Sequence, residues 1–182
     1  HPLEVYHFLR DDLGVQWLQF IPIVERVNSD GRSLIQEGRT VTDRSVKPEQ
    51  WGRFLLAIFD EWVQQDVGRI YITLFEAALA SWLGLPASLC IFDKTCGNAL
   101  AIEHNGDVYS CDHFVEPAYL LGNIQERPLL ELVASEKQRR FGAAKQDALP
   151  EYCLNCAVNF ACHGECPKNR FVDTPDGKPD LN

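Results

Sequence analysis

The chain of 182 residues contains no methionine, and other features are scarce enough to exclude whole classes of protein. No apolar run approaches the ~20 residues that a membrane-spanning helix needs. The chain opens His1-Pro2-Leu3-Glu4 without the apolar core of a secretory signal, so we expect a cytoplasmic protein with no membrane association. Its net charge of −9, without a cluster of lysines and arginines, argues against nucleic acid as a partner.

The composition is nevertheless that of a folded protein. Apolar residues make up 46% of the chain and charged residues 24%, which suits one ordinary domain or two small ones. The first residues already follow a helical apolar pattern, and no initiator methionine precedes them. We therefore expect the chain to begin inside a longer protein.

Helix and strand signals alternate along the first half of the chain. The expected elements are a helix at 3–13, a strand at 15–21, a long loop at 24–46, a helix at 48–67, a strand at 69–73 and a helix at 74–83. Gly14 and Gly84 suit helix ends, and Pro48 suits a first helical turn. The order indicates an α/β fold, the last units of a parallel sheet or barrel that this chain is too short to close.

The pattern changes near Leu85-Pro86, which predicts two parts, 1–84 and 85–182. In the second part, 99–103 and 107–111 flank Asn105-Gly106, a strong hairpin signal. A helix is expected at 128–141, followed by a cysteine-bearing loop and a polar tail over 147–182. The second part therefore predicts a hairpin with short helices, and the chain as a whole reads as α+β.

All seven cysteines lie in the second part: Cys90, Cys96, Cys111, Cys153, Cys156, Cys162 and Cys166. Disulfides are disfavoured because the number is odd and nothing indicates export. Structural zinc stays open, although only Cys153 and Cys156 form a typical knuckle. The third interpretation is an iron–sulfur site, since C-x2-C-x5-C-x3-C-P is a relaxed form of the ferredoxin run.

In two-cluster ferredoxins the last cysteine of that run binds the other cluster. Applied here, this rule joins Cys166 to Cys90, Cys96 and Cys111 at one cluster. Cys153, Cys156 and Cys162 then hold a second cluster whose fourth ligand lies beyond Asn182.

Residues 96–115, 121–124 and 153–171 resemble the auxiliary-cluster (SPASM) domain of anaerobic sulfatase-maturating enzymes. Upstream, Leu18-Gln19-Phe20-Ile21-Pro22 resembles a late strand of that family's radical S-adenosylmethionine barrel. The resemblance implies an oxidoreductase that converts an active-site Cys or Ser of a sulfatase polypeptide to formylglycine. It also implies two auxiliary [4Fe–4S] clusters with the crossed ligation given above. A third [4Fe–4S] cluster and S-adenosylmethionine belong to the full-length enzyme.

Two departures from the family pattern limit what this chain can do alone. The C-x3-C-x2-C motif of the radical-generating cluster is absent, and so is the eighth auxiliary cysteine. We therefore expect the chain by itself to be inactive and to yield no 5′-deoxyadenosine.

The resemblance also assigns individual roles. Asp112 matches the proposed general base, with a turn-capping aspartate as the ordinary alternative. Leu18 is a candidate contact for S-adenosylmethionine, or simply a buried strand residue. His113 and His163 are expected near the clusters rather than as iron ligands. His1, His7 and His104 are expected at the surface.

Two rival functions remain. One is another SPASM-containing enzyme that modifies a ribosomal peptide, although the Asp-His-Phe-Val sequence after Cys111 favours the maturase. The other is a non-catalytic metal-binding module that recruits a partner, which would need no radical cluster upstream.

Overall fold

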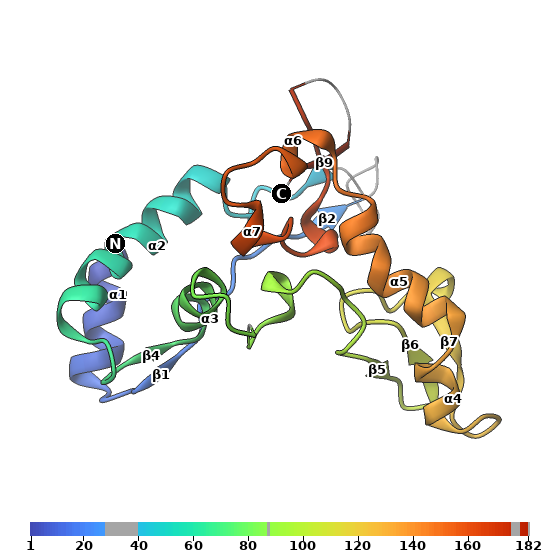
Figure 1. The fold of residues 1–182 in the computed structure, drawn as a ribbon. Helices are drawn as coiled ribbons and strands as arrows, with labels where there is room; N and C mark the ends of the chain where they lie inside the picture. The colour runs from blue at the N-terminus through green and yellow to red at the C-terminus, as the bar shows by residue number, and fades with distance from the viewer. Residues whose placement is uncertain (28–39, 87, 176–178, 182) are drawn as a thin grey trace.

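The computed structural model describes residues 1–27, 40–86, 88–175 and 179–181. Most of the first half of the chain lies on one side of the molecule in Figure 1, and the hairpin region lies on the other. The short helices near the carboxyl end lie between these two regions. None of the described helices is both long enough and apolar enough to cross a membrane.

The first half contains the expected parallel strand pair. Helix α1 (Pro2–His7) continues as a π-helical turn at Phe8–Asp12, in agreement with the predicted helix. Strand β1 (Trp17–Leu18) pairs in parallel with β4 (Tyr71–Ile72), in the register Trp17 to Tyr71 and Leu18 to Ile72. Both strands are shorter than predicted because only the paired residues form a ladder.

Helices α2 (Pro48–Gln65) and α3 (Thr73–Trp82) occupy the predicted positions. They enclose a core with the strand pair and α1, made of Tyr6, Leu18, Ile58, Trp62, Ile70, Ile72 and Phe75. Trp62 is 1% exposed, and Phe59 meets Phe75 edge to face. The aromatic stripe of α2 is therefore largely core packing, as expected from its helical spacing.

A polar network fixes α1 against α2. Asp66, 1% exposed, accepts hydrogen bonds from the Tyr6 hydroxyl and from Arg10, both at 2.8 Å. Arg10 also donates to Glu61, and His7 Nε2 lies 2.8 Å from a Glu61 oxygen. His7 lies at the helix surface as predicted, with 43% of its side chain exposed, and its ring also joins this network.

The predicted loop at 24–46 was only partly right. Strands β2 (Arg26–Val27) and β3 (Thr40–Val41) form an antiparallel pair inside it, while 28–39 fall outside the described residues. Arg26 Nη1 donates to Lys168 O at 2.8 Å, so this segment contacts the carboxyl-terminal part of the chain.

The hairpin prediction is confirmed. Strands β5 (Ala101–Ile102) and β6 (Asp107–Tyr109) pair around Asn105-Gly106, where Gly106 has a φ of 91° that favours glycine. A third strand, β7 (Leu120–Asn123), adds to β6, and the sequence did not predict it. Val108, Leu121 and Leu132 form the small core beneath this sheet.

The single helix predicted at 128–141 was wrong. The structure has α4 (Leu129–Val133) and α5 (Glu136–Asp147) instead. Ser135 separates them because its hydroxyl accepts a hydrogen bond from the backbone of Gln138 and so caps α5. After this restart α5 runs from the hairpin region toward the short helices near the carboxyl end (Figure 1).

The tail at 147–182 also contains more structure than predicted. It has α6 (Glu151–Leu154), α7 (Asn159–Cys162), β8 (Val172–Asp173) and β9 (Pro179–Leu181). The Ser81 hydroxyl donates to Ala161 O at 2.8 Å, which ties α3 to α7. The two halves of the chain are thus in direct contact.

Candidate metal centre

All seven cysteines lie in described segments and are free thiols, so the disulfide alternative finds no support. The sequence predicts two groups, and their assignment to clusters stays a prediction. Cys90, Cys96, Cys111 and Cys166 form the first group, and Cys153, Cys156 and Cys162 form the second.

The first group is brought together from four separate segments. Burial raises the pKa of Cys111 to about 12 and that of Cys166 to about 11. Burial is also the largest cause that raises the pKa of Cys96, and the charge of Cys90 raises it further. The charges of Cys96 and Cys90 add to the effect of burial on the pKa of Cys166. Cys166 acts in the same direction on Cys111. Each thiol is therefore close enough to another member of the group to interact electrostatically.

Helix α5 holds the segments that carry three of these cysteines. The amide of Gln138 donates to Gly97 O at 2.8 Å and to Ser110 O at 3.0 Å, next to Cys96 and Cys111. One turn further along, Gly142 O accepts from the backbone N–H of Cys96 at 3.1 Å. A Cβ on Gly142 would lie 2.6 Å from Cys96 O, so only glycine permits this approach.

Lys145 lies on the same face of α5 and contacts the segment that carries Cys90. Its Nζ donates to Cys90 O at 2.7 Å, to Ile91 O at 2.9 Å and to Asp93 O. Burial lowers the pKa of Lys145, whereas charges on Cys96 and Cys90 raise it. The side chain is 1% exposed and lies within the electrostatic reach of the first group.

Arg170 fixes the segment that carries Cys166. It donates from Nη1 to Lys145 O and from Nε to Gly164 O, both at 2.8 Å. His163, Gly164 and Glu165 have φ values of 49°, 72° and 52°, a left-handed turn that non-glycine residues rarely adopt. Such strain persists only where the surroundings enforce it, and this turn lies between Cys162 and Cys166.

The residues fit an iron–sulfur cluster better than a single zinc ion. Four sulfurs at about 2.3 Å from one tetrahedral zinc would lie about 3.8 Å apart. Within the described part of the chain, the group whose potential ligand atoms all lie within 4.8 Å of one another is Cys111, Asp112 and His113, with one sulfur. Among the described residues no three of these four thiols lie that close together, and a cluster of several iron atoms spaces its cysteines more widely than one zinc ion does.

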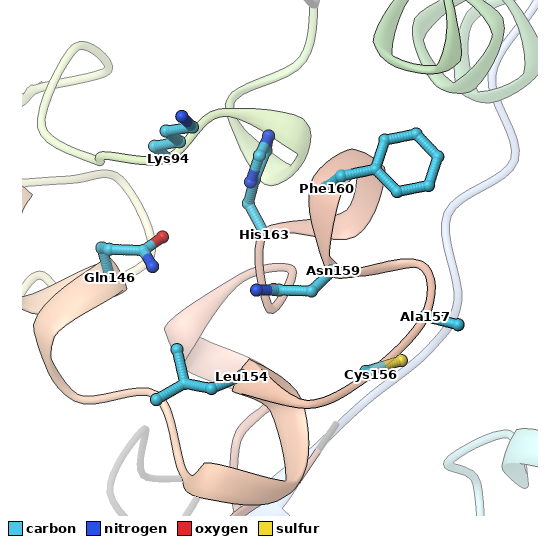
Figure 2. A pocket seen from close by; sticks show the side chains of 8 residues that line it. All are labelled: Lys94, Gln146, Leu154, Cys156, Ala157, Asn159, Phe160 and His163. Atoms are coloured by element: carbon cyan, nitrogen blue, oxygen red, sulfur yellow. The ribbon is translucent and has the colours of Figure 1, made fainter.

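The second group lies on the two short helices near the carboxyl end. Cys153 is in α6, Cys156 follows it, and Cys162 ends α7. Figure 2 shows Cys156 at the edge of a cavity of about 520 Å³. His163, Lys94 and Phe160 line the same cavity, and burial lowers the pKa of His163. This region is more open than the first group.

Asp112 is exposed, although Cys111 before it and Phe114 after it are buried. The Cys111 thiol donates to Asp112 Oδ1 at 3.1 Å, so among the described residues this carboxylate contacts a thiol rather than capping the turn. His113 Nδ1 lies 3.8 Å from Cys166 Sγ, as expected of a histidine near the first group. His104 is exposed, also as expected.

Leu18 is 7% exposed and belongs to the core around Trp62. Its carbonyl accepts from the Thr73 hydroxyl at 3.2 Å. These contacts agree with its ordinary role as a buried strand residue, and a ligand contact at Leu18 stays a prediction.

Sequence reasoning missed the residues that hold the cysteines in place, namely Gln138, Gly142, Lys145 and Arg170. The first three recur at helical spacing on one face, where a buried helix normally carries apolar residues. A Gln, Gly and Lys at such positions signal a face that packs on backbone instead of on side chains.

Residues 90–157 match the SPASM family, described as an iron–sulfur cluster-binding domain. The whole chain is 50% identical to a serine-type anaerobic sulfatase-maturating enzyme of Bacteroides thetaiotaomicron and covers 45% of that protein. A serine-type enzyme of Klebsiella pneumoniae is 32% identical over 85% of this chain and 36% of its own length. A cysteine-type enzyme of Clostridium perfringens is 27% identical over 93% of this chain and 44% of its own length.

A solved structure of native anSMEcpe with bound AdoMet and Cp18Cys peptide superposes with a TM-score of 0.80 at 29% identity. The match covers 100% of this chain and 48% of that one. The chain therefore contains an SPASM iron–sulfur domain within a mixed helix and strand fold, and spans less than half the length of these relatives.

Proposed function

We propose that this chain, which belongs by sequence and fold with the anaerobic sulfatase-maturating enzymes, is the auxiliary-cluster part of such an enzyme. The observation that carries the proposal is the first cysteine group. Helix α5 and Arg170 bind the backbone beside all four of these cysteines, and the Cys111 thiol donates to Asp112.

In this proposal Cys90, Cys96, Cys111 and Cys166 hold one [4Fe–4S] cluster. Cys153, Cys156 and Cys162 hold another, with a fourth ligand from outside these 182 residues. A longer polypeptide supplies the radical-generating cluster and most of the S-adenosylmethionine site. We keep the cytoplasm as the proposed compartment, since thiols stay reduced there.

The parallel pair of β1 and β4 is a further argument that this chain is part of a longer polypeptide. A parallel sheet is normally buried on both faces, and two strands alone are marginally stable. Here Trp17 is 72% exposed and Ile21 73%, although both are large and apolar. Further strands flanking β1 and β4 would complete a barrel, with 1–84 as its last units and 85–182 as the SPASM part.

Conversion of a serine side chain to formylglycine removes one hydrogen atom, one proton and one electron. S-adenosylmethionine, bound mainly by the longer polypeptide, would supply the radical chemistry that takes the hydrogen atom from the β-carbon. Asp112 accepts the proton of the substrate hydroxyl at its carboxylate, which is exposed and therefore accessible. When bound, the first cluster supplies a one-electron acceptor immediately beside that carboxylate.

The proposed substrate is a sulfatase segment with a serine target. The relatives described as serine-type are 50% and 32% identical to this chain, whereas the cysteine-type relative is 27% identical. Exposure of Asp112 suits an extended peptide that approaches the first group from solvent.

A chimera tests the function directly. The chain replaces its counterpart in the Bacteroides thetaiotaomicron relative, and the purified protein is reconstituted with iron and sulfide. It is then given S-adenosylmethionine, a reductant and sulfatase peptides that differ only in carrying Ser or Cys. We expect 5′-deoxyadenosine and, from the Ser peptide, a product lighter by two hydrogens. The Cys peptide, whose product would in addition carry oxygen in place of sulfur, should react less.

The chain of 182 residues alone is the matched control and should produce no 5′-deoxyadenosine. A chimera that binds iron but modifies neither peptide would contradict the maturase and favour a modifier of other peptides. Tightly held zinc without iron would instead favour a non-catalytic metal-binding module.

A further inference from the structure

Lys145 is an unusual residue for the interior. Lysine is almost never fully buried without partners, yet this side chain is 1% exposed. Its Nζ donates to the carbonyls of Cys90, Ile91 and Asp93. Three carbonyl acceptors match the three N–H bonds of an ammonium group. The surroundings of Nζ are therefore arranged to accept a protonated lysine.

This charge lies where the segments of the first cysteine group meet. The ammonium binds the turn that begins at Cys90, and Lys145 O accepts from Arg170, which in turn holds Gly164 two residues before Cys166. Gly142, one turn earlier on the same helix, binds the backbone of Cys96. Lys145 thus connects the backbones of ligands that are far apart in sequence.

We propose that Lys145 is a positioning residue for the first cluster, which fixes the Cys90 turn and sets a positive charge at the backbone of that ligand. The proposal rests on the assignment of these four cysteines to one cluster. Reduction adds one electron, supplied by an external reductant, to a site that is already negatively charged. A buried cation at short range favours the reduced form, because the charge is poorly screened there. Lys145 should therefore raise the reduction potential and retain the Cys90 ligand.

The test compares Lys145→Met and Lys145→Gln with the parent chain of 182 residues after anaerobic reconstitution. Methionine removes the charge and all three hydrogen bonds, whereas glutamine removes the charge and keeps an amide donor. Lys137→Met is the matched control, because Lys137 lies on the same helix and donates to Leu120 O at 2.7 Å from an exposed position. Iron, acid-labile sulfide and the midpoint potential of the reduced cluster are measured. The relevant signal is the one that Cys111→Ala abolishes.

We expect Lys145→Gln to lower the reduction equilibrium constant of that cluster about tenfold, or about 59 mV for a one-electron couple. Lys145→Met should in addition lose iron faster to a chelator, and Lys137→Met should match the parent. An unchanged potential in Lys145→Gln would overturn the charge role, and unchanged iron loss in folded Lys145→Met would overturn the positioning role. If Lys145→Met does not fold, Lys145→Gln still decides the charge role. A parent chain that holds no iron would count against the cluster assignment itself.

Discussion

The close approach of α5 to Cys96 gives a quantitative prediction for Gly142→Ala. An alanine Cβ would lie 2.6 Å from Cys96 O, which is shorter than real Cβ contacts, and the neighbour is backbone that has little freedom to move. The same glycine accepts the Cys96 N–H at 3.1 Å. The helix must therefore move away from the segment that carries Cys96.

Three contributions set the size of the effect. Overpacking of this kind typically destabilises by about 1–3 kcal/mol. Weakening the Cys96 hydrogen bond adds about 1 kcal/mol. Replacing glycine by alanine within a helix returns about 1 kcal/mol. The free energy of unfolding should thus fall by about 1–3 kcal/mol, with a lower iron content after reconstitution because Cys96 is displaced.

Gly52→Ala is the matched control. Gly52 is inside α2, needs no positive φ, and has no neighbouring atom within 4 Å of the place that an alanine Cβ would take. Only the helix-propensity gain applies there, so this variant should be about 0.5–1 kcal/mol more stable than the parent. Urea unfolding of the metal-free, reduced chains measures both changes. If Gly142→Ala unfolds at the same urea concentration as Gly52→Ala and binds iron normally, α5 does not hold Cys96 in the way described.

Three further predictions concern the base, the buried network and pH. In the chimera, Asp112→Asn should keep its iron and lose about 100-fold or more in peptide oxidation, and normal turnover would remove Asp112 from the mechanism. Tyr6→Phe should lower the free energy of unfolding in urea by about 1.5–3 kcal/mol, because it removes a hydrogen bond to the buried carboxylate of Asp66. Tyr71→Phe is its control. The exposed Tyr71 hydroxyl donates to Gly68 O at 3.3 Å, and its loss should cost less than about 1 kcal/mol. The pKa values of Cys111 and Cys166 are about 12 and about 11 when folded, above the ordinary 9.0, so the folded metal-free chain keeps protons that the unfolded chain releases. Stability should then be full below about pH 9 and fall as pH rises toward 11, and Cys166→Ala should flatten this decline in unfolding experiments across that range.

Local signals in the sequence predicted the elements that depend on local physics. The helix over 48–67 follows from Pro48 and an apolar stripe, and the hairpin follows from Asn105-Gly106, because these effects act within a few residues. Strand β7 was missed because its pairing with β6 depends on a partner more than ten residues away. The break at Ser135 was missed because a serine inside a helical pattern is read as a cap only when the new helix direction is known.

By itself, the sequence determined the kind of site, since the number, type and spacing of its cysteines favoured iron–sulfur ligation, which the SPASM match supports. The grouping of Cys166 with the three earlier cysteines stays a prediction. Only the tertiary structure decided what holds those cysteines in place. Gln138, Gly142 and Lys145 act on backbone carbonyls and N–H groups of segments 28 to 55 residues away. A backbone acceptor has no side-chain identity, so such contacts leave no pattern in the sequence and become visible only when the chain has folded.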